Sequence, residues 1–393
     1  MASSSPRIAI IFGTRPEAIK LAPLARAAAA LGGWEVEVWA TGQHRQLVTG
    51  IAEELELVAD VRLEAMTPGQ SLTSLSARLL DQLGPQIAER KPTWLIVQGD
   101  TTTAMIGAMA GFYAGVRVAH VEAGLRTGDR SAPFPEEVNR AVISRFADLH
   151  LASTPRAEAA LRAEGIDPEM IEVTGNTVVD ALRWMVGRLP KDGSPPLGYG
   201  ELARFAGAEG RRLVLITGHR RESFAGGLEA ICDGLAELAR RWPKVDFVYP
   251  VHLNPAVQRA VHGRLAGLAN VHLLAPVGYA AAIWLLRQAA FVITDSGGIQ
   301  EEAPELGKPA LVTRASTERP EALEQGYALL VGYDAAAMIA AADRWLGDPA
   351  AYAAASPRAG AGPFGDGLAS ARCVAALRRR LGLALAEEIP PWP

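Results

Sequence analysis

Short apolar runs alternate along the whole chain with longer stretches whose apolar residues recur at helical spacing. Each apolar run leads into a polar loop, often with a glycine, and an alanine- and leucine-rich stretch follows. This order of strand, loop and helix is typical of parallel sheets that are covered by helices on both faces. The predicted strands are 8–12, 36–40, 94–97, 117–121, 149–152 and 171–173 in the first half, and 213–216, 246–249, 271–274, 291–294, 310–312 and 329–331 in the second.

The pattern therefore predicts an α/β protein with two doubly wound, Rossmann-like parallel-sheet domains that face a central cleft. A proline-rich loop at 190–196 separates the two halves. We predict a first domain at 1–185 and a second, nucleotide-binding domain at 186–367. We expect the terminal segment, 368–393, to form a helix that packs back on the first domain.

The composition suits a globular protein of this size. A chain of 393 residues is long enough for two domains, and 49% hydrophobic and 21% charged residues are ordinary values. A formal net charge of -4 argues against general binding to nucleic acid or to a membrane surface. Because we find no run of ~20 apolar residues and no signal-like start, we expect a cytoplasmic protein. Cys232 and Cys373 lie in helix-like stretches, so we predict inert thiols, with neither a disulfide framework nor a metal site.

Residues that can do chemistry follow the predicted strands directly, where ligands of open α/β sheets bind. The first strand leads into Gly-Thr-Arg-Pro-Glu at 13–17, in which glycine, threonine and proline suit a turn, a helix cap and a helix start. Arg15 and Lys20 are different, because cations near a helix N-terminus oppose its dipole unless an anion is present. They predict a contact with phosphate. The turn lacks G-x-G-x-x-G, which argues against NAD, and we predict no cofactor.

Three carboxylates of the first half are candidates for acid–base chemistry. Asp100 follows a glycine at the end of a strand, where it could be a helix cap or a catalytic group. Glu122 emerges from a buried strand, and it could form an ion pair with Arg126 or act as an acid or base. Glu136 lies in the first turn of a predicted helix, where acids usually complement the dipole, so its position alone indicates little.

The second half has its own candidates. His219 directly follows a strand, where it could transfer a proton or contact phosphate. Ser296, Gly297 and Gly298 open a helix whose N-terminus favours an anion and lets the backbone approach it. Glu302, further along this helix, could accept hydrogen bonds from a ribose diol.

Taken in order, these motifs resemble the UDP-N-acetylglucosamine 2-epimerase family. The resemblance runs from residue 8 to about 332, and it implies a glycosyltransferase-B-type fold, usually in a homodimer. The segments that carry it are 13–17, 41–44, 99–103, 120–127, 135–140, 219–222, 296–302 and 317–320.

The resemblance also implies roles for individual residues. The catalytic set that it implies is Asp100, Glu122, Glu136 and His219. The UDP-binding set that it implies is Arg15, Ser296, Gly297, Gly298, Glu302 and Arg319. Some bacterial members are activated by their own substrate at a second site, and Gln43, Gln46 and Gln70 match glutamines implicated there.

The chemistry explains why such a set is needed. The C2 proton of N-acetylglucosamine is not beside a carbonyl, so an enzyme must either oxidise a neighbouring carbon or expel UDP from C1. The missing dinucleotide fingerprint favours expulsion, which gives a 2-acetamidoglucal to which UDP returns after reprotonation on the opposite face. The alternatives are a hydrolysing 2-epimerase that releases N-acetylmannosamine and UDP, a glycosyltransferase of the same fold, and a sensor that binds the nucleotide sugar without turnover.

Overall fold

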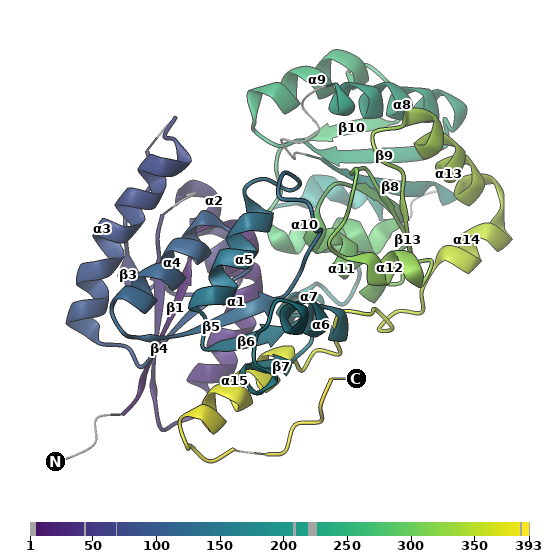
Figure 1. Ribbon diagram of the computed structural model, residues 1–393. Coiled ribbons are helices and arrows are strands. Elements are labelled where there is room, and N and C mark those ends of the chain that lie inside the picture. Colours follow the sequence, from purple (N-terminus) through teal and green to yellow (C-terminus); the bar gives the residue numbers. More distant parts are fainter. Residues whose placement is uncertain are drawn as a thin grey trace. The chain divides into compact units, whose positions relative to one another are not determined.

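The computed structural model describes residues 5–42, 45–67, 69–206, 210–218, 226–385 and 387–392, with 45–49 described by backbone alone. These residues form two compact units (Figure 1). Unit 1 consists of Met1–Trp184 and Phe364–Pro393, and unit 2 consists of Met185–Pro363. The chain therefore leaves unit 1, forms unit 2 and returns to unit 1 for its last segment.

Unit 1 contains a seven-stranded parallel sheet with the order β3-β2-β1-β4-β5-β6-β7. Every residue of β4 is buried, as expected for a parallel sheet covered on both faces. The strand order reverses between β1 and β4, so their carboxyl ends form a topological switch point. The strands are β1 Arg7–Phe12, β2 Glu35–Ala40, β3 Val61–Arg62, β4 Trp94–Gln98, β5 Arg117–Ala123, β6 Leu149–Ala152 and β7 Ile171–Val173.

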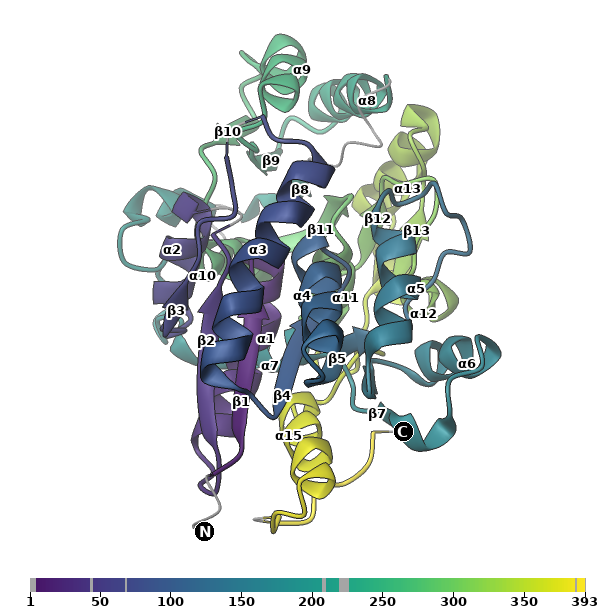
Figure 2. The ribbon, with the colours of Figure 1, turned by 60° about the vertical axis from the view of Figure 1, so that its left-hand side comes forward.

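Helices α3, α4 and α5 lie side by side on one face of this sheet (Figure 2). The helices of unit 1 are α1 Arg15–Ala29, α2 Arg45–Glu54, α3 Leu72–Arg90, α4 Thr102–Tyr113, α5 Glu136–Phe146, α6 Pro155–Ala163 and α15 Ala369–Arg380, with the 3-10 turn η1 Pro168–Met170; α7 Thr177–Arg188 runs into unit 2.

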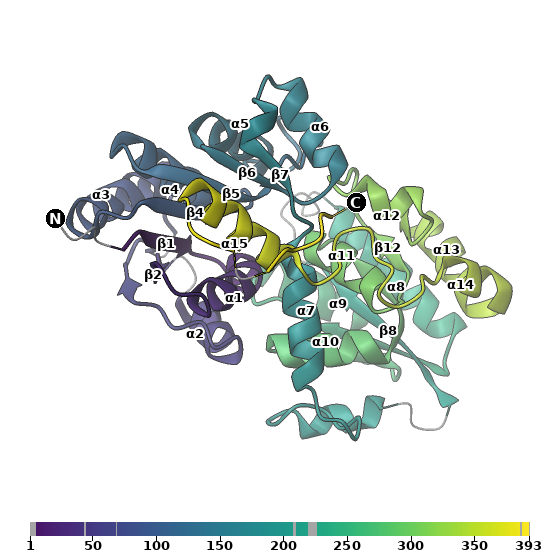
Figure 3. The ribbon, with the colours of Figure 1, turned by 90° about the horizontal axis from the view of Figure 1, so that it is seen from below.

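The returning segment is tied firmly into unit 1. Helix α15 packs against α1 (Figure 3). The Asp180 carboxylate accepts hydrogen bonds from the first amides of α15, at 2.7 Å from Ser370 N and 3.3 Å from Ala369 N. This carboxylate caps the helix as an N-cap side chain would, although it comes from another helix.

Unit 2 contains a six-stranded parallel sheet with the order β10-β9-β8-β11-β12-β13, and this order reverses between β8 and β11. Its strands are β8 Arg212–Thr217, β9 Val245–Pro250, β10 Val271–Leu274, β11 Ala289–Thr294, β12 Ala310–Val312 and β13 Ala328–Leu330. Its helices are α8 Gly227–Arg241, α9 Pro255–Leu265, α10 Tyr279–Gln288, α11 Gly297–Glu305, α12 Pro320–Glu324, α13 Ala335–Gly347 and α14 Pro349–Ala355, with the 3-10 helix η2 Gly200–Phe205.

The structure confirms the predicted α/β class and each of the predicted strands. Cys232 and Cys373 are fully buried in α8 and α15, and burial raises the pKa of both thiols to about 12, so they are unreactive as predicted. The two-residue strand β3 is an addition that the apolar pattern did not predict. Within the described ranges, no helix is long and apolar enough to cross a membrane.

Candidate active site

The carboxyl ends of β1, β4 and β5 lie at one edge of the unit 1 sheet, because these strands are parallel and neighbouring. Ligands of open α/β sheets bind at such an edge, next to the point where the strand order reverses. Arg15, Asp100 and Glu122 belong to the segments in which these three strands end. The structure therefore brings the predicted residues from three parts of the sequence to one edge.

Glu122 lies at a register shift in the pairing of β5 with β6. Its φ of 62° falls in the left-handed region, which costs energy for a residue with a side chain and is common at functional sites. The carboxylate Oε2 accepts hydrogen bonds from Gln98 Nε2 at 3.0 Å and from Asn176 Nδ2 at 3.1 Å, and it forms an ion pair with Lys20. Because Glu122 is only 5% exposed, these three donors offset the cost of burying its charge.

The ion pair of Glu122 is with Lys20 and not with Arg126, the partner considered from the sequence. Arg126 instead binds Glu164, with Nε 2.7 Å from Oε1. Lys20 is itself buried, and its ammonium group is held against Glu122. A contact of Lys20 with phosphate, as the sequence predicts, would require this ammonium to leave or share its carboxylate.

Asp100 is held by two side chains of α5. Arg140 Nη1 lies 2.5 Å from Asp100 Oδ2, and Asn139 Nδ2 donates to the Asp100 carbonyl oxygen at 2.8 Å. The Asp100 side chain is 27% exposed, whereas that of Arg140 is 1% exposed, so the arginine fixes the carboxylate from the protein side. Part of the Asp100 side chain therefore stays exposed.

The start of α5 also carries Glu136, one helical turn before Arg140 and on the same side of the helix. Its neighbour Glu137 pairs with Arg140 and accepts hydrogen bonds from the amides of Thr127 and Gly128. Burial alone would raise the pKa of Glu137, but the hydrogen bonds from Arg140 and from these amides outweigh it and hold the pKa below its usual value. Glu137 and Arg140 thus fix the beginning of α5, and sequence reasoning had given them no role in the site.

Glu17 is a third residue to which sequence reasoning gave no role in the site. Its Oε2 accepts hydrogen bonds from Gly13 N at 3.0 Å, Thr14 N at 2.7 Å and Thr14 Oγ1 at 2.7 Å. Its Oε1 accepts one from Thr101 Oγ1 at 2.6 Å. Glu17 therefore joins the loop that precedes Arg15 to the loop after β4. The signal was present in the sequence as Thr-x-x-Glu, the pattern of a helix capping box.

In unit 2, helix α11 begins at the carboxyl end of β11, beside the switch point between β8 and β11. Ser296 is its N-cap, and within the described residues its side chain makes no capping hydrogen bond. The Ser296 amide donates to Thr294 Oγ1 at 2.9 Å, which ties the helix start to the strand. The following amides, of Gly297 and Gly298, belong to a helix N-terminus that favours an anion.

Arg319 packs directly against the start of α11. A Cβ on Gly297 would lie 2.6 Å from Arg319 Nη1, so only glycine leaves room for the guanidinium. Arg319 is 4% exposed, and it binds Glu301 Oε1 at 2.6 Å and Glu318 Oε1 at 2.5 Å. Glu318 binds Arg314 at 2.8 Å in turn. This buried network of two arginines and two glutamates fixes the Arg319 guanidinium beside the helix N-terminus.

Of the remaining predicted residues, Glu302 and Gln70 are described by the structure, and the side chains of the others are not. Glu302 is buried, and its Oε1 accepts a hydrogen bond from Tyr279 Oη at 2.8 Å. His219 and Gln43 lie outside the described residues, as does the side chain of Gln46. Gln70 is described, and its side chain closes a local turn by accepting hydrogen bonds from Thr67 N at 3.1 Å and Thr67 Oγ1 at 3.0 Å.

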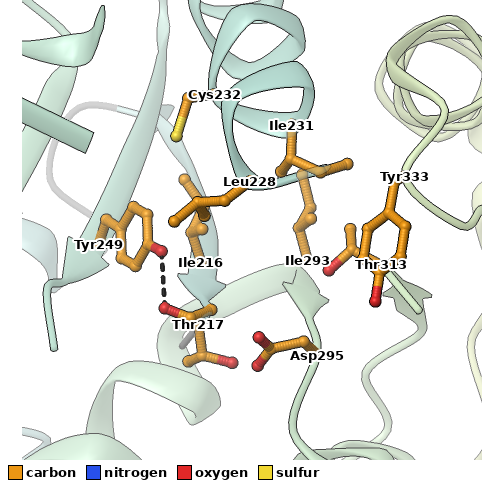
Figure 4. Close-up of a pocket in the computed structure, with 11 residues that line it drawn as sticks. Ile216, Thr217, Leu228, Ile231, Cys232, Tyr249, Ile293, Asp295, Thr313 and Tyr333 are labelled. Carbon is orange, nitrogen blue, oxygen red and sulfur yellow. Dashed lines mark hydrogen bonds between the residues drawn. The ribbon is translucent and has the colours of Figure 1, made fainter. Parts of the chain in front are cut away.

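A pocket opens in unit 2 beside this helix start, at the carboxyl ends of β8, β11 and β12 (Figure 4). Its polar lining comes from Thr217, Gly218, Tyr249, Asp295, Thr313 and Tyr333. The pocket therefore lies at the switch point of the second sheet.

Two parallel-sheet units with carboxylates at one switch point and an anion-favouring helix at the other define an α/β enzyme of glycosyltransferase-B-like fold. The family model of UDP-N-acetylglucosamine 2-epimerase matches residues 26–378. The chain belongs to the UDP-N-acetylglucosamine 2-epimerase family.

Known proteins agree along nearly the whole chain. A UDP-N-acetylglucosamine 2-epimerase of Yersinia pestis is 45% identical over 373 residues, which cover 95% of this chain and 98% of the relative. The crystal structure of a Neisseria meningitidis UDP-GlcNAc 2-epimerase bound to UDP-GlcNAc is 36% identical, with a TM-score of 0.88 over 95% of this chain and 100% of that one. The S. aureus MnaA–UDP co-structure is 35% identical, with a TM-score of 0.91 over 99% and 100% of the two chains.

Proposed function

We propose that this enzyme converts UDP-N-acetylglucosamine to UDP-N-acetylmannosamine by eliminating UDP to a 2-acetamidoglucal and adding it back. Family membership and the Neisseria meningitidis relative bound to UDP-GlcNAc support the substrate. The observation that carries the mechanism is the division of labour between the units. Unit 1 offers hydrogen-bonded carboxylates, of which Glu122 is buried and Asp100 is partly exposed, and unit 2 offers a helix N-terminus beside a buried arginine.

The reaction needs these groups for a stereoelectronic reason. In the α-linked gluco sugar, C2–H and C1–O are antiperiplanar, so the C2 proton can leave as the C1–O bond to UDP breaks. A base must take the proton, an acid must return one on the other face, and the departing diphosphate must be stabilised. Addition of UDP to the reprotonated sugar then gives the manno epimer.

We assign the hydrogen transfers at C2 to Asp100, Glu122, Glu136 and His219. The three donors on Glu122 and the Arg140 contact of Asp100 hold two of these carboxylates in place, which is what a positioned acid or base requires.

We assign UDP to the second set, in which the N-terminal amides of α11 and the guanidinium of Arg319 would hold the diphosphate. Glu302 would accept hydrogen bonds from the ribose hydroxyls, and Arg15 would contact phosphate. The remaining members of this set are Ser296, Gly297 and Gly298.

The test is to incubate the purified protein with UDP-N-acetylglucosamine in deuterated water and to follow C2 by NMR. We expect UDP-N-acetylmannosamine with deuterium at C2. Epimerisation with the original hydrogen retained would refute the elimination. Release of free N-acetylmannosamine and UDP would instead identify a hydrolysing enzyme, and transfer of the sugar to an acceptor without deuterium at C2 would identify a glycosyltransferase.

A variant sharpens this test. Glu122→Gln removes the carboxylate but keeps the size of the side chain, and we expect kcat to fall by about 10²–10⁴-fold, the usual contribution of a general acid or base. The matched control is Glu158→Gln, which removes a carboxylate from a surface pair with Arg162 on α6. Equal activity of the two variants would exclude Glu122 from the catalytic set.

We also propose that the enzyme is a homodimer that pairs through the ends of α4 and α5. Phe112 and Tyr113 at the end of α4 are 56% and 71% exposed, and the Phe112 ring lies 5.3 Å from that of Phe146 on α5. Clustered exposed aromatic side chains mark association surfaces. Light scattering should show a dimer for the wild type and a monomer for Phe112→Asp. Leu197→Asp, at a fully exposed leucine of unit 2, should remain a dimer.

A further inference from the structure

The buried network around Arg319 balances two positive charges against two negative ones. Arg319 binds Glu301 and Glu318, and the other carboxylate oxygen of Glu318, Oε2, lies 2.8 Å from Arg314 Nη1. All four side chains are at most 5% exposed. Because buried charges are screened little by water and salt, the sum of these four charges acts at the start of α11.

Contacts within unit 2 hold this network beside the helix. Thr317 Oγ1 donates to Gln300 Oε1 of α11 at 2.7 Å, and it accepts a hydrogen bond from the Arg319 amide at 3.2 Å. Arg314 directly follows Thr313, which lines the pocket at the carboxyl ends of the strands (Figure 4). The segment that carries both arginines is therefore registered to α11 and to the edge of the pocket.

An anion at the start of α11 would meet carboxylates as well as helix amides. Asp295 directly precedes the N-cap of this helix, and it lines the pocket (Figure 4). Arg319 alone cannot balance Glu301 and Glu318, since one guanidinium and two carboxylates leave one net negative charge. Arg314 supplies the missing positive charge. It therefore removes a repulsion that a diphosphate would otherwise meet.

We propose that Arg314 is a positioning residue for UDP: by neutralising Glu318, it leaves the Arg319 guanidinium able to attract the diphosphate. Arg314 does this without touching the nucleotide. The inference rests on the proposed function, in which the start of α11 and Arg319 hold the diphosphate. It adds that the affinity for UDP follows the net charge of the four-residue network.

The test measures the Kd for UDP by calorimetry while the network charge is changed in both directions. Arg314→Met makes the network negative, Glu318→Gln makes it positive, and the two substitutions together keep it neutral. We expect UDP to bind about tenfold more weakly to Arg314→Met, at least as tightly to Glu318→Gln, and within about threefold of the wild type to the double variant. If Glu318 served only to hold Arg319 in place, Glu318→Gln would instead weaken binding.

Two controls separate this electrostatic effect from a general loss of structure. Uridine lacks the diphosphate, so its Kd, measured by ligand-observed NMR, should differ less than about twofold among the variants. Arg211→Met removes the same charge from an ion pair with Asp246, where Nε lies 2.8 Å from Oδ2, at the amino end of the unit 2 sheet. This variant should bind UDP like the wild type.

The two single variants have opposite expected effects, so either one tests the inference if the other does not fold. Wild-type affinity for UDP in Arg314→Met, equal losses for UDP and uridine, or weaker UDP binding by Glu318→Gln would overturn the inference. Wild-type protein that does not bind UDP would refute the proposed nucleotide site, and the inference with it. Wild-type protein that binds UDP without epimerising the nucleotide sugar would refute the proposed reaction alone, and the order of affinities would still test the role of Arg314.

Discussion

Two buried histidines should make unit 1 sensitive to acid. His120 on β5 and His150 on β6 occupy paired positions on adjacent strands, and both are 0% exposed. Burial lowers the pKa of His120 to about 4, and burial together with the neighbouring His120 lowers the pKa of His150 to about 3. Both rings are therefore neutral in the folded state at pH 5, where exposed histidines carry a proton.

The sign and size follow from linkage. Because the folded pKa lies below that of the unfolded chain, the unfolded state binds more protons, and stability is lost as the pH falls below about 6.5. Between pH 7.5 and 5.0 each histidine costs about 2 kcal/mol, or about 4 kcal/mol for the pair, at ~1.36 kcal/mol per pKa unit. At pH 5.0 neither ring is charged in the folded state. The free-energy cost therefore hardly depends on the electrostatic interaction between the two histidines.

The perturbation is His150→Leu, which removes one titrating ring. Urea titrations at pH 7.5 and 5.0, with pulsed hydrogen exchange to follow unit 1 peptides separately, give the free energy of unfolding of this unit. Burial raises the pKa of Glu17 and Asp180, which acts in the opposite direction, so the comparison is between variants. We expect His150→Leu to lose about 2 kcal/mol less than the wild type on acidification. His262→Gln, at an exposed histidine of unit 2, should match the wild type. Equal losses in wild type and His150→Leu would refute the reasoning.

Three further predictions concern the two sites. Lys20→Met should cost unit 1 about 3–5 kcal/mol in urea unfolding by leaving Glu122 without its cation, and Lys20→Met with Glu122→Gln should cost less; an additive double variant would contradict the ion pair. Gly297→Ala should weaken UDP binding at least tenfold in calorimetry, because its Cβ meets Arg319, and unchanged affinity would separate that arginine from the nucleotide site. Glu17→Gln turns an amide NH₂ toward the N–H and O–H donors that the carboxylate now accepts from, and it should cost about 1–3 kcal/mol of unit 1 stability. A Tm equal to that of the wild type would show that these hydrogen bonds contribute little to stability.

The strands were predictable because buried parallel strands are read directly as apolar runs. Both sheets are built from such runs. The position of the polar residues at the carboxyl ends of the strands could be predicted because each of these residues directly follows an apolar run in the sequence. The two-residue strand β3 could not be found in this way, because two residues show no periodicity. The catalytic and UDP-binding roles of the predicted residues remain predictions that the variants above would test.

Partners of side chains far apart in sequence were not predictable. Glu122 has Arg126 nearby in the chain, yet it binds Lys20, which is brought to β5 from α1 by the packing of the sheet. Arg319 against Gly297 is a similar case, since the sequence shows the arginine and the glycine but not their contact. Helix periodicity and turn residues specify local structure, whereas these contacts depend on the tertiary packing.

The route of the chain has a consequence for biosynthesis. A ribosome completes the whole of Met185–Pro363 before it begins the segment that unit 1 still requires. Until then Asp180 has no helix start to cap, and the Gly32 carbonyl lacks its hydrogen bond from Arg378, which is 2.8 Å long in the folded protein. The part of the nascent chain that emerges first is therefore the last to reach its native state, and its apolar helix faces must stay out of wrong associations while the middle of the polypeptide folds.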